Sequence, residues 1–96
     1  MRTMITLRIP VETGNRTIKD GSLPQVIQQT MEKIKPESAY CYLENGRRTL
    51  RAVFDLKDAN DMVAAFEPVM MALNAELELV PVMTVEELGA GFAKMG

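Results

Sequence analysis

The dipeptide Asn45-Gly46 constrains this chain more than any other feature of its sequence. It stands between two runs of alternating apolar and polar residues, and both of its positions favour the positive φ angles of a type I′ turn. We therefore predict a β-hairpin with a two-residue loop. Such a loop sets the strand register and pairs residues at equal distances from the turn: Glu44 with Arg47, Tyr42 with Thr49, Tyr40 with Arg51, and Ala39 with Ala52.

Alternate positions of the hairpin share a face, and one face is small and apolar, as expected beneath a helix. It carries Ala39, Cys41, Leu50, Ala52 and Phe54. Cys41 is the only cysteine, so it cannot form a disulfide within the chain. We expect a buried structural thiol and not a nucleophile, because the chain has no histidine that could generate a thiolate.

The segments before the hairpin predict a strand and a helix. Residues 2–9 alternate between apolar and polar side chains, which is typical of a strand. Residues 23–35 have apolar positions at helical spacing, with Ser22 as the expected N-cap and Pro36 as the stop signal. Residues 11–21 between them are polar and interrupted by glycine, and they allow at most a short helical turn.

The segments after the hairpin predict a second helix, a fourth strand and a short C-terminal helix. The second helix should begin after Asp58, a suitable N-cap. Pro68 removes a backbone donor and clashes with the preceding turn, so we expect a kink or break near residues 64–67. The fourth strand is expected over residues 75–80, and residues 84–87 form a capping box for the last helix.

The order of these elements predicts the fold. Strand, helix, strand, strand, helix, strand is the split βαβ pattern of the ferredoxin-like fold. We expect an α+β fold in which residues 1–96 form a single ferredoxin-like domain. Its four-stranded antiparallel sheet should have the order 4-1-3-2, with the central pair as the one parallel exception. Two helices should cover one face of the sheet, with the short C-terminal helix added.

Composition argues against several classes of function. The 11 basic and 13 acidic side chains give a net charge of -2, whereas nucleic-acid binding usually needs a basic face. Histidine, the commonest metal ligand, is absent, and we expect neither a metal site nor a cofactor. No apolar run approaches the roughly 20 residues of a membrane helix. Residues 1–10 resemble a strand and not a signal peptide, so we expect a cytoplasmic protein.

Two helices cover only one side of a four-stranded sheet, so the other side is either solvated or covered by a partner. That side mixes apolar, aromatic and charged residues: Met4, Thr6, Arg8, Tyr40, Tyr42, Glu44, Thr49, Arg51, Val53, Asp55, Glu76, Glu78, Val80 and Val82. Large mixed patches on small proteins often mark interfaces, and two-fold dimers are the commonest oligomers. We therefore predict a homodimer that forms through this face.

Four residues of this face, Arg8, Tyr40, Arg51 and Glu78, have the chemistry to bind a polar or anionic ligand. Guanidinium groups pair with carboxylates, and a tyrosine hydroxyl can donate a hydrogen bond. The alternative is that these residues and Tyr42 make cross-strand contacts and ion pairs within the dimer interface. A guanidinium buried there must keep a partner, and we expect Arg51 to pair with a carboxylate of the same face.

Residues 35–40 (KPESAY), 44–49 (ENGRRT), 74–76 (NAE) and 81–83 (PVM) resemble an uncharacterised bacterial group of the dimeric α+β barrel superfamily. The resemblance covers nearly the whole chain and implies two ferredoxin-like subunits with their sheets packed face to face. The superfamily includes cofactor-free monooxygenases, muconolactone isomerases and haem enzymes, and the haem enzymes usually carry a proximal histidine that this chain lacks. Its ligand cavities lie between helices and sheet, which makes Glu67 a pocket-edge candidate; the alternative is a solvent-exposed glutamate.

The sequence contains no catalytic constellation, so two functions stay open. The first is binding of a small apolar or aromatic molecule between helices and sheet, with or without a cofactor-free monooxygenase- or isomerase-like reaction. The second is a homodimeric structural or regulatory accessory module without catalysis. A closed apolar cavity above roughly 300 Å³ between helices and sheet would favour the first, and a solidly packed layer would favour the second.

Overall fold

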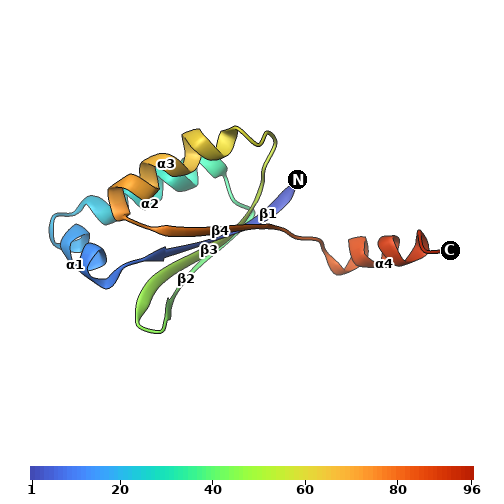
Figure 1. Ribbon diagram of the computed structural model, residues 1–96, viewed down its shortest axis with the longest axis horizontal. Helices are drawn as coiled ribbons and strands as arrows, with labels where there is room; N and C mark the ends of the chain where they lie inside the picture. The colour runs from blue at the N-terminus through green and yellow to red at the C-terminus, as the bar shows by residue number, and fades with distance from the viewer.

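The computed structural model describes residues 1–96 and has the predicted α+β, ferredoxin-like architecture, with one additional helix (Figure 1). In chain order the elements are β1 (Arg2–Ile9), α1 (Val11–Lys19), α2 (Ser22–Ile34), β2 (Ser38–Glu44), β3 (Arg47–Asp55), α3 (Asp61–Leu73), β4 (Glu76–Pro81) and α4 (Val85–Ala93). None of the helices combines the length and the hydrophobicity that a membrane span requires.

The four strands form one sheet with the order β2-β3-β1-β4, and the predicted hairpin register is confirmed. Tyr42 pairs with Thr49 and Tyr40 with Arg51, with Asn45 and Gly46 at positive φ in the turn. All neighbouring strands are antiparallel, so the expected parallel central pair is wrong. The reason is topological: β1 and β2 run in the same direction, and β3 reverses at the turn before it inserts between them.

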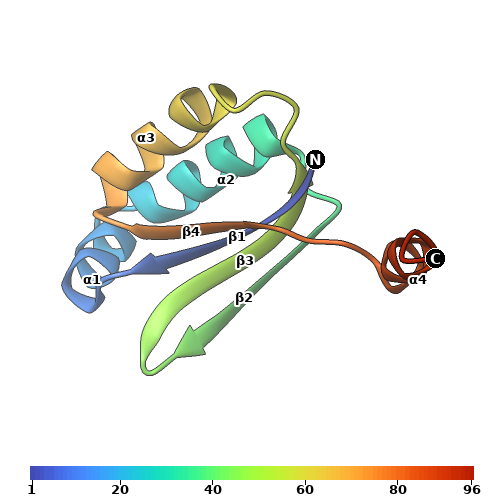
Figure 2. The same ribbon diagram turned by 45° about the vertical axis from the view of Figure 1, so that its right-hand side comes forward.

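The core lies between the sheet and two helices, α2 and α3, which lie side by side on one face (Figure 2). The alternate residues of β1 and β3 point into it, as the period-two pattern predicted. Phe54 of β3 and Phe66 of α3 meet edge to face, with ring centres 5.8 Å apart at 75°. The buried apolar residues are Ile5, Leu7, Ile9, Ile34, Leu50, Ala52, Phe54, Ala65, Phe66, Val69, Leu73 and Ala75.

Helix α1 is longer than the single turn that the sequence allowed. Its buried residues are Thr13, Gly14 and Thr17, whereas Val11 and Ile18 stay about half exposed. The Thr17 hydroxyl donates to the Thr13 carbonyl at 2.7 Å, so this buried polar group is satisfied within the helix. Burial of small polar residues produces no hydrophobic periodicity, which is why the pattern did not reveal the helix.

Helix α2 begins at Ser22, and the prediction that Ser22 is its N-cap is wrong. The N-cap is Gly21, whose φ of 80° lies in the left-handed region that favours glycine. The Asp20 carboxylate accepts hydrogen bonds from the Ser22 backbone N–H at 2.9 Å and from the Ser22 hydroxyl at 2.6 Å. The preceding aspartate therefore takes the role that the sequence pattern assigned to serine.

Helix α3 follows Asn60 and continues through Pro68, so the predicted break near residues 64–67 does not occur. Tertiary packing overrides the local cost of the proline, because helical stability in proteins comes mainly from burial of an apolar face. Four side chains of α3 are buried against the sheet and α2: Ala65, Phe66, Val69 and Leu73.

Helix α4 forms where the capping box predicted it. The Thr84 hydroxyl accepts from the Glu87 backbone N–H at 3.1 Å, and the Glu87 carboxylate accepts from the Thr84 N–H at 3.0 Å. No residue of α4 is buried, and the helix projects beyond the end of the sheet (Figure 1). The molecule consequently measures 56 × 29 × 17 Å, and its radius of gyration of 15.4 Å exceeds the roughly 12.5 Å of a compact chain of this length.

Candidate functional site

The sheet surface opposite α2 and α3, here called the open sheet face, brings all five predicted site residues together. Two adjacent rows cross the four strands from β2 to β4: Tyr40, Arg51, Thr6 and Glu78 in one row, and Tyr42, Thr49, Arg8 and Glu76 in the other. Glu44 and Arg47 flank these rows at the hairpin end, and Met4, Val53 and Val80 flank them at the opposite end. The register of the Asn-Gly hairpin is what assembles this surface.

Arg8 lies at the centre of the open sheet face and binds two carboxylates. Its Nε donates to Glu44 on the edge strand β2, and its Nη1 donates to Glu78 on β4 at 2.8 Å. Thr49 separates Arg8 from β2 in the register and is only 3% exposed, so a small side chain leaves room for the guanidinium to reach across. The hydrogen bond from Arg8 lowers the pKa of the Glu44 carboxyl below its ordinary value.

In the single chain Arg51 has no carboxylate partner within ion-pair distance, and the ion pair expected on burial in a dimer stays a prediction. Its Nε donates to the Thr6 hydroxyl at 3.1 Å, and its guanidinium carbon lies 5.6 Å from the centre of the Tyr42 ring. Glu44 and Glu78, two carboxylates of the same face, are both engaged by Arg8. The cross-strand contact between tyrosine and arginine therefore forms, but diagonally and with Tyr42 in place of the directly paired Tyr40.

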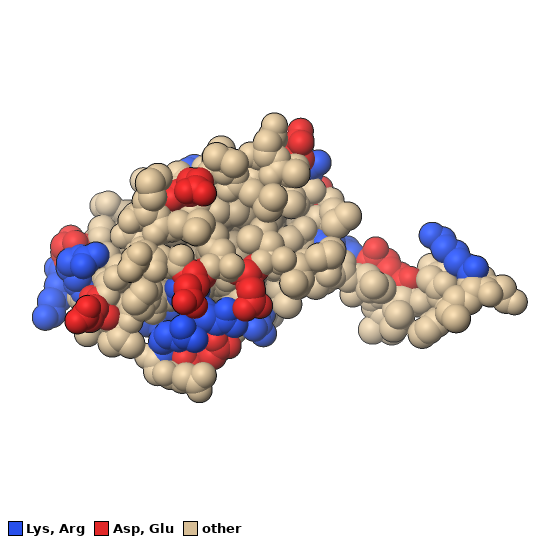
Figure 3. Space-filling model, viewed as in Figure 1, with Lys and Arg blue, Asp and Glu red and all other residues tan.

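The open sheet face carries balanced charge and uncovered apolar surface. Its acidic and basic side chains intermingle along one side of the molecule, with no region of one sign (Figure 3). Arg47 reaches Glu76 at 3.5 Å and thereby joins the inner strand β3 to the edge strand β4. Tyr40 is 72% exposed and Val80 40% exposed. A single chain leaves this mixture of rings, aliphatic groups and neutralised ion pairs in contact with water.

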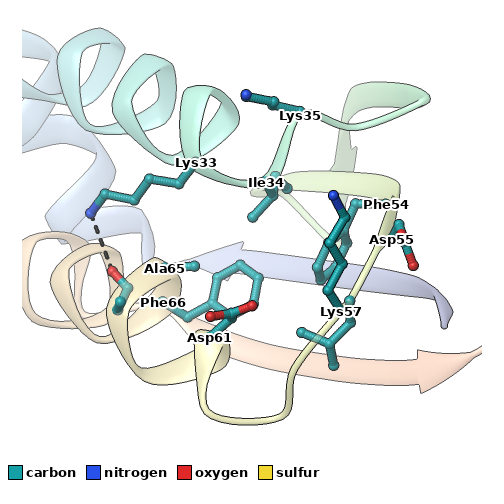
Figure 4. Close-up of a pocket in the computed structure, with 11 residues that line it drawn as sticks. Lys33, Ile34, Lys35, Phe54, Asp55, Lys57, Asp61, Ala65 and Phe66 are labelled. Carbon is teal, nitrogen blue, oxygen red and sulfur yellow. Dashed lines mark hydrogen bonds between the residues drawn. The ribbon is translucent and has the colours of Figure 1, made fainter.

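A second feature is a cleft of about 510 Å³ at the end of the helix–sheet layer, where α2 ends and α3 begins (Figure 4). Phe54 and Phe66 contribute apolar surface to it. Its charged lining residues are Lys33, Lys35, Lys57, Asp55 and Asp61, and we call it the lysine cleft. Sequence reasoning missed it, because its lysines belong to the ends of two different elements and converge only in the folded chain.

Lys33 is held at the lysine cleft by a backbone group that Pro68 leaves free. A proline at position 68 has no N–H to donate to the carbonyl of Ala64, four residues earlier. Lys33 Nζ donates to that carbonyl at 3.2 Å (Figure 4). A side chain of α2 thus supplies the hydrogen bond that α3 lacks, and it links the two helices at the mouth of the cleft.

Glu67, the predicted pocket-edge residue, lies on α3 outside the lysine cleft. It is exposed and lines a shallow hollow of about 170 Å³ between α3 and β4, together with Met62, Met70 and Leu79. Its role as a pocket-edge residue stays a prediction.

Cys41 is exposed, so the expectation of a buried thiol is wrong. It does point to the helix side of the sheet, as its position in the hairpin predicted. However, β2 is an edge strand that contributes no residue to the core, because α2 and α3 do not extend over it. Cys41 instead lines an open groove of about 330 Å³ between β2 and the start of α2.

Comparison with known proteins shows the fold and no closer relationship. No protein-family profile and no curated protein sequence matches this chain. A formyltetrahydrofolate deformylase from Pseudomonas putida KT2440 superimposes with a TM-score of 0.58 at 15% identity, over 85% of this chain and 29% of that protein. The regulatory subunit of aspartate kinase from Thermus flavus gives 0.56 at 21% identity, over 83% of this chain and 51% of that protein. The chain spans about half or less of these proteins, and the likeness supports its ferredoxin-like fold.

Proposed function

We propose that this chain is a homodimeric accessory module with a regulatory or structural role and no catalytic reaction of its own. The observation that carries the proposal is the open sheet face, which combines exposed apolar groups with charges that are already paired. We infer that two copies pack these faces together around a two-fold axis.

Internal pairing of the charges makes the open sheet face suitable for burial. An unpaired charge is costly to desolvate, whereas a guanidinium that keeps its carboxylate or hydroxyl partner loses much less. Arg8 keeps Glu44 and Glu78, and Arg51 keeps Thr6 and the Tyr42 ring. Three arginines and three glutamates balance one another on the face, so two identical faces have no net repulsion to overcome.

The regulatory role is supported by the fold. One of the solved structures with this fold is described as a regulatory subunit, of aspartate kinase. Fold by itself does not determine function. The catalytic alternative, a cofactor-free monooxygenase- or isomerase-like reaction, has no specific observation in its favour, because core side chains fill the centre of the helix–sheet layer.

Light scattering combined with size-exclusion chromatography tests the dimer. We expect a mass of twice 10.7 kDa at micromolar concentrations. Tyr40→Glu should dissociate the dimer, because it places an unpaired charge in the interface. The matched control is Met71→Glu, which changes a similarly exposed residue of α3 on the far side of the molecule. A native mass of 10.7 kDa, or equal dissociation of the two variants, would refute the proposal.

The lysine cleft favours a second function, binding of a small anionic molecule with an apolar body. Three ammonium groups and two aromatic rings line it, and its volume of about 510 Å³ lies in the usual range for small-molecule sites. We propose an aromatic carboxylate as its ligand class. Titration with benzoate, followed by NMR, should shift the amides around Phe54, and Lys57→Gln should weaken the binding several-fold. Lys19→Gln, on α1, is the control; equal affinities for both variants would exclude the cleft as the site.

A further inference from the structure

Helix α4 carries an apolar side that nothing in its own chain covers. Val85, Leu88, Phe92 and Met95 recur at helical spacing and are 81%, 43%, 62% and 82% exposed. In Figure 3 the side of the projecting helix away from its charged residues is covered by uncharged atoms. The capping box at Thr84 satisfies backbone groups of the first turn of the helix. An ordered apolar helix in water is the expected state of an arm that lacks its docking site.

The base of this arm is fixed to the body of the molecule. Arg2 on β1 forms an ion pair with Glu87, in the first turn of α4. The Val82 backbone N–H also donates to the Arg2 carbonyl at 3.0 Å, which extends the contact between β1 and the chain leaving β4. Two contacts with one residue therefore hold the arm at the end of the sheet where β1 begins.

An apolar groove lies at the opposite end of the same sheet. It occupies about 330 Å³ between the edge strand β2 and the start of α2. Its apolar lining residues include Ile9, Leu23, Ile27, Cys41, Leu43 and Leu50, and Leu43 is 72% exposed. We call it the β2 groove. It exists because α2 and α3 leave the helix side of β2 bare.

The arm cannot reach the β2 groove of its own chain. Arg2 pairs with Glu87, whereas Ile9, seven residues further along β1, lines the groove, a separation of about 24 Å along a strand. From Glu87 to Phe92 the helix advances only about 7.5 Å. The two apolar surfaces of the chain therefore stay separate in a monomer.

We propose that α4 of one protomer docks in the β2 groove of a second copy, with Leu88 and Phe92 as the inserted side chains. A two-fold axis makes the contact reciprocal, so that each arm and each groove is covered once. Arg48 flanks the β2 groove. Glu86 of α4 has no ion-pair partner within its own chain. Arg48 of one copy and Glu86 of the other therefore have complementary charges at the edge of the proposed contact.

The arms supply part of the area that a stable dimer needs. Each arm exposes four large apolar side chains, on the order of 100 Å² each. Two arms then remove about 800 Å² from solvent, about half of a standard specific interface. The inference rests on the dimer proposed above, and it adds a second contact surface to the open sheet face.

Cys41, the only cysteine, lies in the β2 groove and provides the test. Leu88→Cys in the full-length chain should give a covalent dimer under mild oxidation, with a Cys41-to-position-88 disulfide identified by peptide mapping. The control is Ala90→Cys, on the opposite side of α4 about 200° away. We expect at least tenfold faster cross-linking for Leu88→Cys, and loss of the cross-link when Cys41→Ser is added.

Four results would overturn the inference. A disulfide within one chain would show that the arm folds back, and cross-linking that persists with Cys41→Ser would show that the two arms pair with each other. Equal rates for the two cysteine variants would show that the arm does not dock in the groove. A native mass of two chains without the specific cross-link would leave the open-sheet-face dimer standing and refute the arm alone. The specific cross-link in a dimer that Tyr40→Glu does not dissociate would support the arm and refute the sheet-face interface.

Discussion

The hydrogen bond between Lys33 and the Ala64 carbonyl makes the energetic cost of Pro68 measurable. A proline inside a helix costs about 3 kcal/mol relative to alanine, through the lost hydrogen bond and the clash with the preceding turn. Lys33 supplies a replacement donor at 3.2 Å, on an exposed surface. Such a bond contributes about 1 kcal/mol net. The remaining penalty of Pro68 in this fold is therefore about 2 kcal/mol.

Pro68→Ala should accordingly stabilise the chain by about 2 kcal/mol. Pro68 is exposed, so the substitution loses little packing. For a chain of 96 residues each kcal/mol raises Tm by roughly 4–8 °C, which predicts an increase of about 8–16 °C. Urea denaturation gives the free energy of unfolding directly. An unchanged or lower stability would refute the expected penalty.

A double-mutant cycle then isolates the contribution of Lys33. Lys33→Met keeps the aliphatic stem and removes the donor, so it should cost about 1 kcal/mol in the native sequence. In the Pro68→Ala background the new backbone N–H at position 68 takes the Ala64 carbonyl, and Lys33→Met should cost almost nothing. Lys19→Met, an exposed lysine of α1, controls for loss of a surface charge. Equal costs of Lys33→Met in both backgrounds would show that Lys33 does not compensate for the proline.

Two further predictions concern the core and the open sheet face. Phe66→Ala should destabilise the chain by about 3–5 kcal/mol, because this core residue is only 3% exposed. The control, Val63→Ala, changes an exposed position of the same helix and should cost little. Similar urea midpoints for the two variants would contradict the burial of Phe66 in the core. The Arg8 hydrogen bond lowers the folded-state pKa of Glu44, so its stabilisation is present above the ordinary carboxyl pKa of 4.5 and is lost as pH falls through the lowered value. The stability difference between the native chain and Arg8→Met, followed by urea denaturation, should therefore shrink as the solution is acidified below about pH 4.5, and a constant difference would argue against the pair.

Much of the site's geometry could be predicted from one turn. The register set by Asn45 and Gly46 assigned Tyr40, Tyr42 and Arg51 to a single face, and the structure confirms that assignment. The partner of Arg51 could not be predicted in the same way. Long side chains on neighbouring strands reach diagonally, and the competition of Arg8 for Glu78 involves residues of three successive strands, β3, β1 and β4.

Features that depend on a few neighbouring residues could be predicted from the sequence alone. These are the positive φ angles of the hairpin turn, the capping box of α4 and the alternation of β1, because each is satisfied within two to four residues along the chain.

Which surfaces are covered could not be predicted in this way, because it depends on how the elements pack. Continuation of α3 through Pro68 needs the core beneath it and Lys33 beside it. Exposure of Cys41 follows from how far two helices extend over four strands. Helix α4 does not reach the β2 groove of its own chain because its base is fixed about 24 Å away along the sheet. Whether a face of the sheet is covered depends on how far helices that are distant in sequence extend over it. Local sequence patterns carry no information about that extent.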